Sequence, residues 1–109
     1  MRDILFRGKR LDNGEWEYGF IVKMFGAYHI IDKDDENTAY EVISETVCQY
    51  TGLNDKNGKR IFENGYMIID KQTYKVLFDN GEYILKNIFN CDTIQLKNNS
   101  NIGVFVDEI

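Results

Sequence analysis

Four Asn-Gly dipeptides constrain the fold of this chain more than any other feature. They begin at Asn13, Asn57, Asn64 and Asn80. Asn-Gly is the preferred centre of the type I′ turns that join antiparallel strands, because both residues tolerate positive φ. The chain has nine glycines and no proline, so glycine, asparagine and aspartate must form its turns. This punctuation predicts a protein built from β-hairpins.

Two of these dipeptides lie between segments that alternate as strands do. Ile4–Leu11 precedes the first, and the segment after it places aromatic residues on one face at positions 16, 18 and 20. Thr73–Phe78 and Glu82–Lys86 flank the last dipeptide in the same way. Each pair predicts a hairpin.

Shorter strands are expected between and after the hairpins, at Ala27–Ile31, Thr38–Ile43, Tyr66–Asp70, Thr93–Leu96 and Gly103–Val106. Helical signals are confined to a weak cap at the start of Ser44–Tyr50 and to the short spacing in Tyr83–Phe89. The predicted fold is therefore all-β, mainly antiparallel, with little helix.

The 109 residues suffice for one compact domain or for two small β lobes. We expect an N-terminal lobe over residues 1–60. A C-terminal lobe over residues 61–109 is expected to be SH3-like or a partial barrel. A single compact domain is the alternative.

Charge and cysteine content limit the classes of function. The net charge of −5 disfavours bulk attraction to DNA or anionic membranes, although Arg2, Arg7, Lys9 and Arg10 make the first ten residues basic. The sequence shows no signal peptide or apolar span, so we expect a cytoplasmic protein. Reduced cysteines follow from that compartment, and Cys48 and Cys91 are expected to be buried hydrophobes.

The inventory of reactive side chains predicts no enzyme, no cofactor and no metal. The single histidine, His29, lies in an alternating aromatic stretch typical of a strand. The acidic segment Asp32–Asn37 lacks the glycine and the terminal glutamate of a calcium loop. A cryptic enzyme that uses a pair of the 18 carboxylates remains the remote alternative.

The N-terminal hairpin interleaves cations with aromatic residues, and two interpretations are open. Arg7, Lys9 and Arg10 with Trp16 could form a stacking platform for single-stranded nucleic acid. The favoured interpretation has the aromatic residues facing the core and the cations facing water, because the aromatic positions share one face.

The segment Tyr50–Glu63 reads YTGLNDKNGKRIFE and also has two interpretations. In the structural one, Thr51 and Asp55 bond the loop backbone, two glycines take positive φ, and Asp55–Lys59 turns in solvent. Its apolar anchors would then pin the two lobes together: Tyr50, Leu53, Ile61 and Phe62. In the functional one, the loop presents Tyr50, Asp55 and Lys56 to a partner.

Two segments resemble the YopX-like family of phage and prophage proteins. They are FRGKRLDNGEWEYGFIV at Phe6–Val22 and EVISETVCQYTGLNDKNGKRIFENGYMI at Glu41–Ile68. The Q-Y-T-G-L-x-D-K-N-G motif is specific to that family. The chain departs from the pattern in having Ser44 for proline, Cys48 for glycine, and Asn64-Gly65-Tyr66 for Gly-Asp-Ile.

The resemblance implies a β-rich accessory protein encoded by a phage or prophage and located in the cytoplasm of a bacterial host. The family has no established biochemical activity, so it implies no catalytic residues. We expect a non-enzymatic module that binds a host or phage macromolecule, and a homo-oligomer is compatible with this. Nucleic acid is the alternative partner. The candidate binding residues are Arg7, Lys9, Arg10, Trp16, Tyr50, Asp55 and Lys56.

Overall fold

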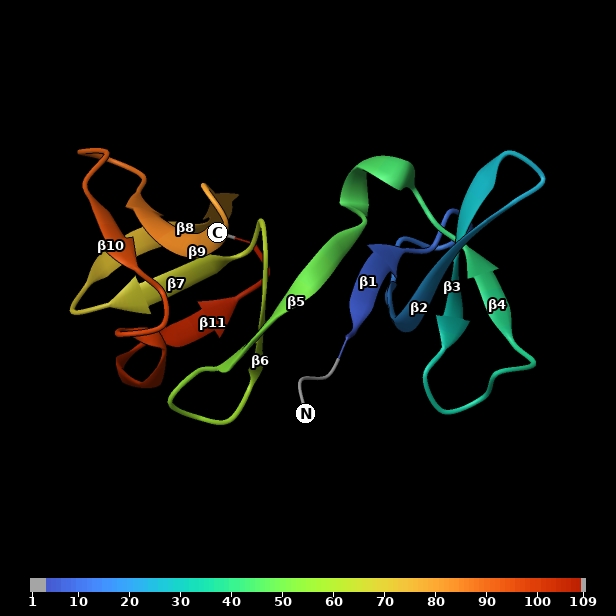
Figure 1. Cartoon of the computed structure of the whole chain (residues 1–109), viewed down its shortest axis with the longest axis horizontal. Helices are drawn as coiled ribbons and strands as arrows, with labels where there is room; N and C mark the ends of the chain where they lie inside the picture. The colour runs from blue at the N-terminus through green and yellow to red at the C-terminus, as the bar shows by residue number, and fades with distance from the viewer. Residues whose placement is uncertain (1–3, 109) are drawn as a thin grey trace. The chain divides into compact units, whose positions relative to one another are not determined.

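A computed structural model describes residues 4–108 and confirms the all-β prediction (Figure 1). The chain divides into two compact units, Met1–Tyr50 and Thr51–Ile109. The predicted boundary at residue 60 between two lobes stays a prediction, as does the SH3-like or partial-barrel shape of the second. Arg2 of the basic N-terminal segment lies outside the described residues.

The strands form two antiparallel sheets. The first has the order β4-β3-β2-β1-β5-β6, and the second has the order β10-β9-β8-β7-β11. The bounds of the first set are β1 (Phe6–Lys9), β2 (Trp16–Met24), β3 (Ala27–Asp32), β4 (Ala39–Glu41), β5 (Cys48–Asn54) and β6 (Arg60–Phe62). Those of the second are β7 (Tyr66–Ile69), β8 (Gln72–Asp79), β9 (Glu82–Asn87), β10 (Thr93–Gln95) and β11 (Val104–Val106).

Helical structure among the described residues is limited to two short 3₁₀ turns. They are η1 (Ser44–Thr46) and η2 (Ser100–Ile102). The weak helical signal of Ser44–Tyr50 therefore marks a single turn before β5. The helical spacing of Tyr83–Phe89 has no helical counterpart, because most of that segment pairs with β8 as strand β9.

The N-terminal unit curls its strands around a small apolar interior. A bridge between Arg10 and Val42 joins the end of β1 to the residue that follows β4. Ile30 and Val42 are buried in this unit. A Cβ on Gly8 would lie 3.0 Å from the Cβ of Val42, which is tighter than a normal contact. Glycine at this position of β1 therefore allows the close approach of the two segments.

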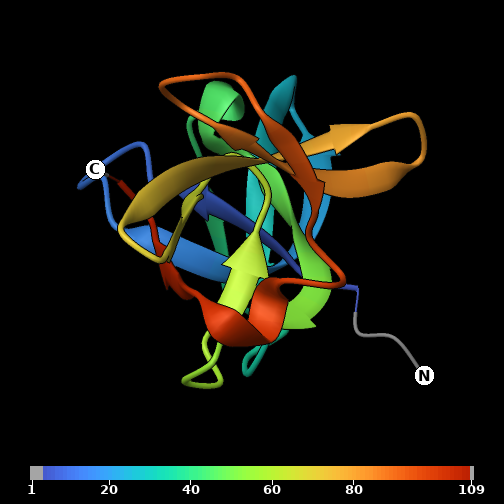
Figure 2. The same ribbon diagram turned by 90° about the vertical axis from the view of Figure 1, so that its left-hand side faces the viewer.

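The C-terminal unit has its apolar core on one face of the second sheet. Val76 pairs with Leu85, and Met67 pairs with Phe105, and all four side chains are at most 1% exposed. A Cβ at Gly65 would lie 2.3 Å from the Phe105 ring, so the packing around this ring requires glycine at position 65. Figure 2 shows the turn between β8 and β9, in orange, extending away from the other strands of this sheet.

The four Asn-Gly dipeptides adopt different conformations. Only Asn80 and Gly81 both have positive φ, at 50° and 81°, as a type I′ turn requires. At the first two dipeptides the glycine alone is left-handed, and at the third Asn64 alone is, with a φ of 68°. The Asn-Gly dipeptides thus predicted the positions of the turns better than their backbone conformations.

The two cysteines have different environments. Cys48 is 3% exposed and confirms the prediction of a buried thiol. For Cys91 that prediction is wrong, because the residue is exposed. It has a φ of 63° in the turn between β9 and β10, where its amide donates to the carbonyl oxygen of Asn87. Its place in a turn, and not in a strand, leaves the thiol in solvent.

Candidate functional site

Arg7 lies inside the molecule, at 2% exposure, on the central part of β1. Its guanidinium carbon is 3.9 Å from the centroid of the Trp16 ring, and its Nε donates to Sγ of Cys48 at 3.4 Å. Antiparallel pairing explains the placement, because Cys48 on β5 is the register partner of Arg7. The expectation that the cations of this hairpin face water is therefore wrong for Arg7.

Lys9 and Trp16 lie next to this buried cation. They are register partners on β1 and β2, and the Lys9 ammonium is 5.3 Å from the Trp16 ring centroid. Both side chains are half-buried. Trp16 thus contacts two cations with one ring. The alternating aromatic and basic residues of this hairpin therefore largely contact one another within the fold.

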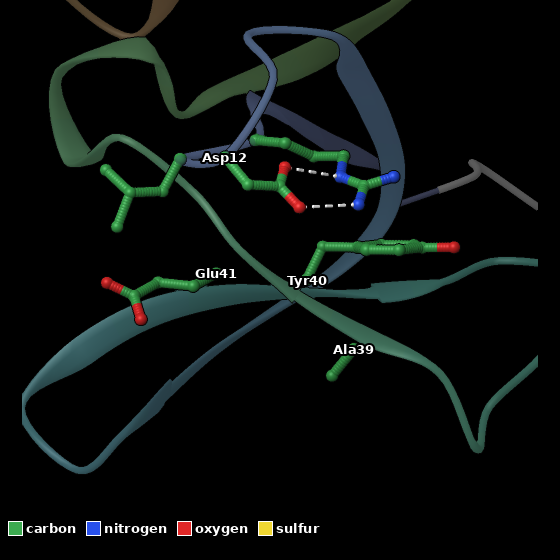
Figure 3. Close-up of a pocket in the computed structure, with 6 residues that line it drawn as sticks. Asp12, Ala39, Tyr40 and Glu41 are labelled. Carbon is green, nitrogen blue, oxygen red and sulfur yellow. Dashed lines mark hydrogen bonds and ion pairs between the residues drawn. The ribbon is translucent and has the colours of Figure 1, made fainter.

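Arg10 belongs to a different group, at a pocket of about 480 Å³ (Figure 3). Its Nε and Nη2 donate to the two carboxylate oxygens of Asp12 at 3.0 and 2.8 Å, and its guanidinium lies 4.4 Å from the Tyr40 ring centroid. The hydrogen bonds with Asp12 raise the pKa of Arg10 and lower the pKa of Asp12. The residues that line the pocket are Arg10, Leu11, Asp12, Ala39, Tyr40 and Glu41.

Asp55 in the predicted binding loop accepts three backbone hydrogen bonds. Its Oδ1 accepts from the amides of Asn57 and Lys59, both at 2.9 Å, and its Oδ2 accepts from the amide of Phe105 at 2.8 Å. The carboxylate therefore closes its own turn and attaches that turn to β11. The sequence predicted that Asp55 lies in solvent. That prediction is wrong, because the residue is only 6% exposed.

The electrostatics of Asp55 match this internal role. Burial alone raises its pKa, but the hydrogen bonds from three backbone amides, aided by the charge of Lys59, outweigh burial, so the pKa of Asp55 is lowered overall. Lys56, the next residue, is exposed, and its backbone amide donates to the carbonyl oxygen of Gly103.

The other parts of the Tyr50–Glu63 motif follow the structural interpretation. Gly52 and Gly58 have φ values of 86° and 81°, and the Thr51 hydroxyl donates to the carbonyl oxygen of Ile61 at 2.7 Å. Three of the four apolar anchors are buried, and Leu53 is half-buried. Whether the anchors join two lobes stays a prediction.

Phe25, which the sequence did not single out, is the most exposed aromatic residue of the described chain. Phe25 is 102% exposed at the turn between β2 and β3, where Phe25 and Gly26 have φ values of 53° and 78°. This is a type I′ turn with phenylalanine at a position that favours asparagine or glycine. Phe20 and Tyr28 on the same hairpin are 55% and 40% exposed. The Phe-Gly dipeptide is the local signal that could have located this turn.

Residues 4–108 contain no group of three His, Cys, Asp or Glu side chains placed to hold a metal ion. His29 is half-buried in β3 with its Nδ1 3.1 Å from the carbonyl oxygen of Ala27. No helix in the described part of the chain is long and apolar enough to cross a membrane.

Comparison with known proteins supports the resemblance seen in the sequence. No curated protein matches the chain. The family model described as YopX protein matches residues 5–106, which includes both motif segments. Because the match extends over nearly the whole described chain, this protein belongs to the YopX family.

Proposed function

We propose that this protein is a non-enzymatic binding module, a phage- or prophage-encoded accessory protein that engages a host or phage macromolecule in the cytoplasm of the bacterial host. The β2–β3 hairpin is its proposed contact surface. The observation that carries the proposal is Phe25, which combines full exposure with a left-handed backbone.

Both properties of Phe25 cost free energy in the isolated molecule. A β-carbon in the left-handed region costs about 1 kcal/mol, and an exposed phenylalanine gains nothing from the hydrophobic effect. Asparagine at the same position would remove most of the strain and the apolar exposure. A residue that opposes both backbone preference and solvation is explained by a contact with another molecule.

Phe25→Asn tests the proposal because binding and stability should change in opposite directions. We expect the variant to be more stable by about 1 kcal/mol. We also expect it to lose proteins that the tagged wild type retains from host lysate. Urea unfolding measures the first effect, and quantitative mass spectrometry of the retained proteins measures the second.

Phe89→Asn is the matched control, since Phe89 is 84% exposed in the other unit and has no positive φ. It should leave both stability and retention near the wild-type values. Equal retention by wild type and Phe25→Asn would overturn the proposed role of the hairpin.

Nucleic-acid binding through the N-terminal hairpin receives less support. Burial of Arg7 and the pairing of Arg10 with Asp12 leave few cations of this hairpin for phosphates. The alternative predicts salt-dependent retention of single-stranded DNA that Arg10→Glu abolishes. Such retention would favour it over the protein-binding proposal.

A further inference from the structure

The outer face of the β8–β9 hairpin carries its charged residues in matched pairs. Val76 and its register partner Leu85 point into the core of the C-terminal unit. Because side chains alternate along a strand, the register pairs on either side of this pair project from the opposite face, as does the pair that closes the turn. These outward pairs are Lys75 with Lys86, Leu77 with Ile84, and Asp79 with Glu82, and the six residues are called the β8–β9 stripe.

The β8–β9 stripe places like charges opposite each other twice. Two ammonium groups are register partners at one end, and two carboxylates are register partners at the other, beside the turn that extends away from the other strands (Figure 2). Like charges at directly opposed positions destabilise a sheet. Within residues 4–108, none of these four side chains forms a hydrogen bond or an ion pair. Both pairs therefore lack an oppositely charged partner in the described chain.

The apolar pair of the β8–β9 stripe lies midway between the two charged pairs. Each charged pair is two residues from Leu77 and Ile84, which is about 7 Å along the strands at about 3.3 Å per residue. Leu77 and Ile84 are half-buried, so part of each side chain is in contact with water. The stripe is thus cationic, apolar and anionic at equal spacing.

This order is complementary to itself. Consider a two-fold axis that lies in the plane between two stripes, crosses the strands and passes over the apolar pair. Rotation about this axis brings Lys75 opposite Asp79 of a second copy and Lys86 opposite Glu82 of that copy, while each apolar residue faces its own counterpart. Two sheets pack face to face with their strand directions within about 30° of each other, and this arrangement is of that kind. Both copies use the same patch, as a two-fold symmetric interface requires.

We propose that the β8–β9 stripe binds a second copy of this chain and forms a two-fold symmetric dimer. Ion pairs between the copies offset the repulsion within each hairpin, and the central apolar side chains lose their remaining contact with water. Six side chains per copy make a small interface, so we expect a dissociation constant of about 10–100 µM. This inference goes beyond the binding function proposed for Phe25, which lies in the other compact unit.

Complementary charge reversals test the dimer on the full chain. Lys75→Glu with Lys86→Glu makes the stripe acidic at both ends, and Asp79→Lys with Glu82→Lys makes it basic at both ends. Each double variant keeps like charges opposite each other, so its monomer should be as stable as that of the wild type. In sedimentation equilibrium, the wild-type mass should rise with concentration towards twice that of the chain. Each double variant alone should dimerise more weakly by about tenfold or more.

An equimolar mixture of the two double variants is the decisive measurement. An acidic stripe then faces a basic stripe at both ends, so the mixed dimer should form at least as tightly as the wild-type dimer. Leu77→Ser should weaken the wild-type and the mixed dimer alike, because leucine faces leucine in both. The matched control is Lys71→Glu with Lys97→Glu, which makes the same change of net charge at exposed positions outside the stripe. Its dissociation constant should lie within about threefold of the wild-type value.

A wild type that is still monomeric at about 1 mM would overturn the inference. Double variants that do not associate when mixed would also overturn it. So would charge reversals that leave dimerisation unchanged, since the dimer would then use another surface. Phe25→Asn should not change the dissociation constant of the dimer, so failure of this inference and failure of the Phe25 proposal are distinguishable.

Discussion

Asp55 shows how one buried carboxylate can fix a turn that its sequence presents as solvent-exposed. Its two oxygens accept three backbone amides, two from its own turn and one from Phe105, fifty residues away. Local sequence predicts the first two bonds, since aspartate commonly accepts from amides that follow it in a turn. The third depends on the tertiary structure and could not be read from the motif. It converts a turn residue into a core residue.

Asp55→Asn should destabilise the protein by about 2 kcal/mol at pH 7, because an amide group cannot accept all three bonds. The folded pKa of Asp55 lies below its usual value near 3.8. Its contribution is therefore complete above that value and is lost as the pH falls through the folded pKa. Urea unfolding should show the difference between wild type and variant shrinking below pH 4. A difference that stays constant down to pH 2 would contradict this role.

At the scale of elements, the strands were predictable and several turns were not. Alternation and the Asn-Gly dipeptides located both hairpins, because period 2 and turn chemistry are local properties. The turn between β7 and β8 carries no such signal, yet Asp70 and Lys71 have φ values of 50° and 66°. The register of Ile69 with Gln72 leaves only two residues for this connection. Sheet pairing therefore imposes a type I′ turn on residues that do not favour it.

Replacing Asp70-Lys71 with Asn-Gly should stabilise the protein by about 1–2 kcal/mol, because it relieves two left-handed residues without touching the core. Both side chains are exposed, so little packing is lost. The native Asn80-Gly81 dipeptide already forms a turn with positive φ at both residues, and it provides the internal reference. Thermal unfolding measures the effect, and an unchanged or lower midpoint would show that the present turn is not strained.

Across the whole molecule, several of the features that local sequence could not predict join distant segments. Arg7 is buried against Trp16 and Cys48, and the Arg10 pocket needs Tyr40 from another strand. The sequence of the cation-rich hairpin is compatible with a binding surface because the tertiary contacts of Arg7 and Arg10 cannot be inferred from sequence. In the family motif, by contrast, the predicted bonds from Asp55 to amides of its own turn are present, since these bonds are local.

Strand β5 contains residues of both compact units. A local loss of structure at one end of this strand is therefore expected to affect the other end. Among the described residues, it pairs with β1 at Phe6 with Gln49 and at Arg7 with Cys48, and the Tyr50 amide donates to the carbonyl oxygen of Leu5. Its other end leads directly into the turn held by Asp55. Loss of that turn should therefore loosen the short pairing around Cys48, because one continuous strand carries both.

Thiol labelling measures this coupling once the exposed Cys91 is replaced. In Cys91→Ser, the buried Cys48 should react slowly in the native state, and its rate should rise with urea. Adding Asp55→Asn should raise the native rate by the factor that its loss of stability implies, about 30-fold for 2 kcal/mol. Adding Lys56→Ala should not, since that side chain is exposed. A rate that Asp55→Asn leaves unchanged would mean that the two units open independently, although β5 runs through both.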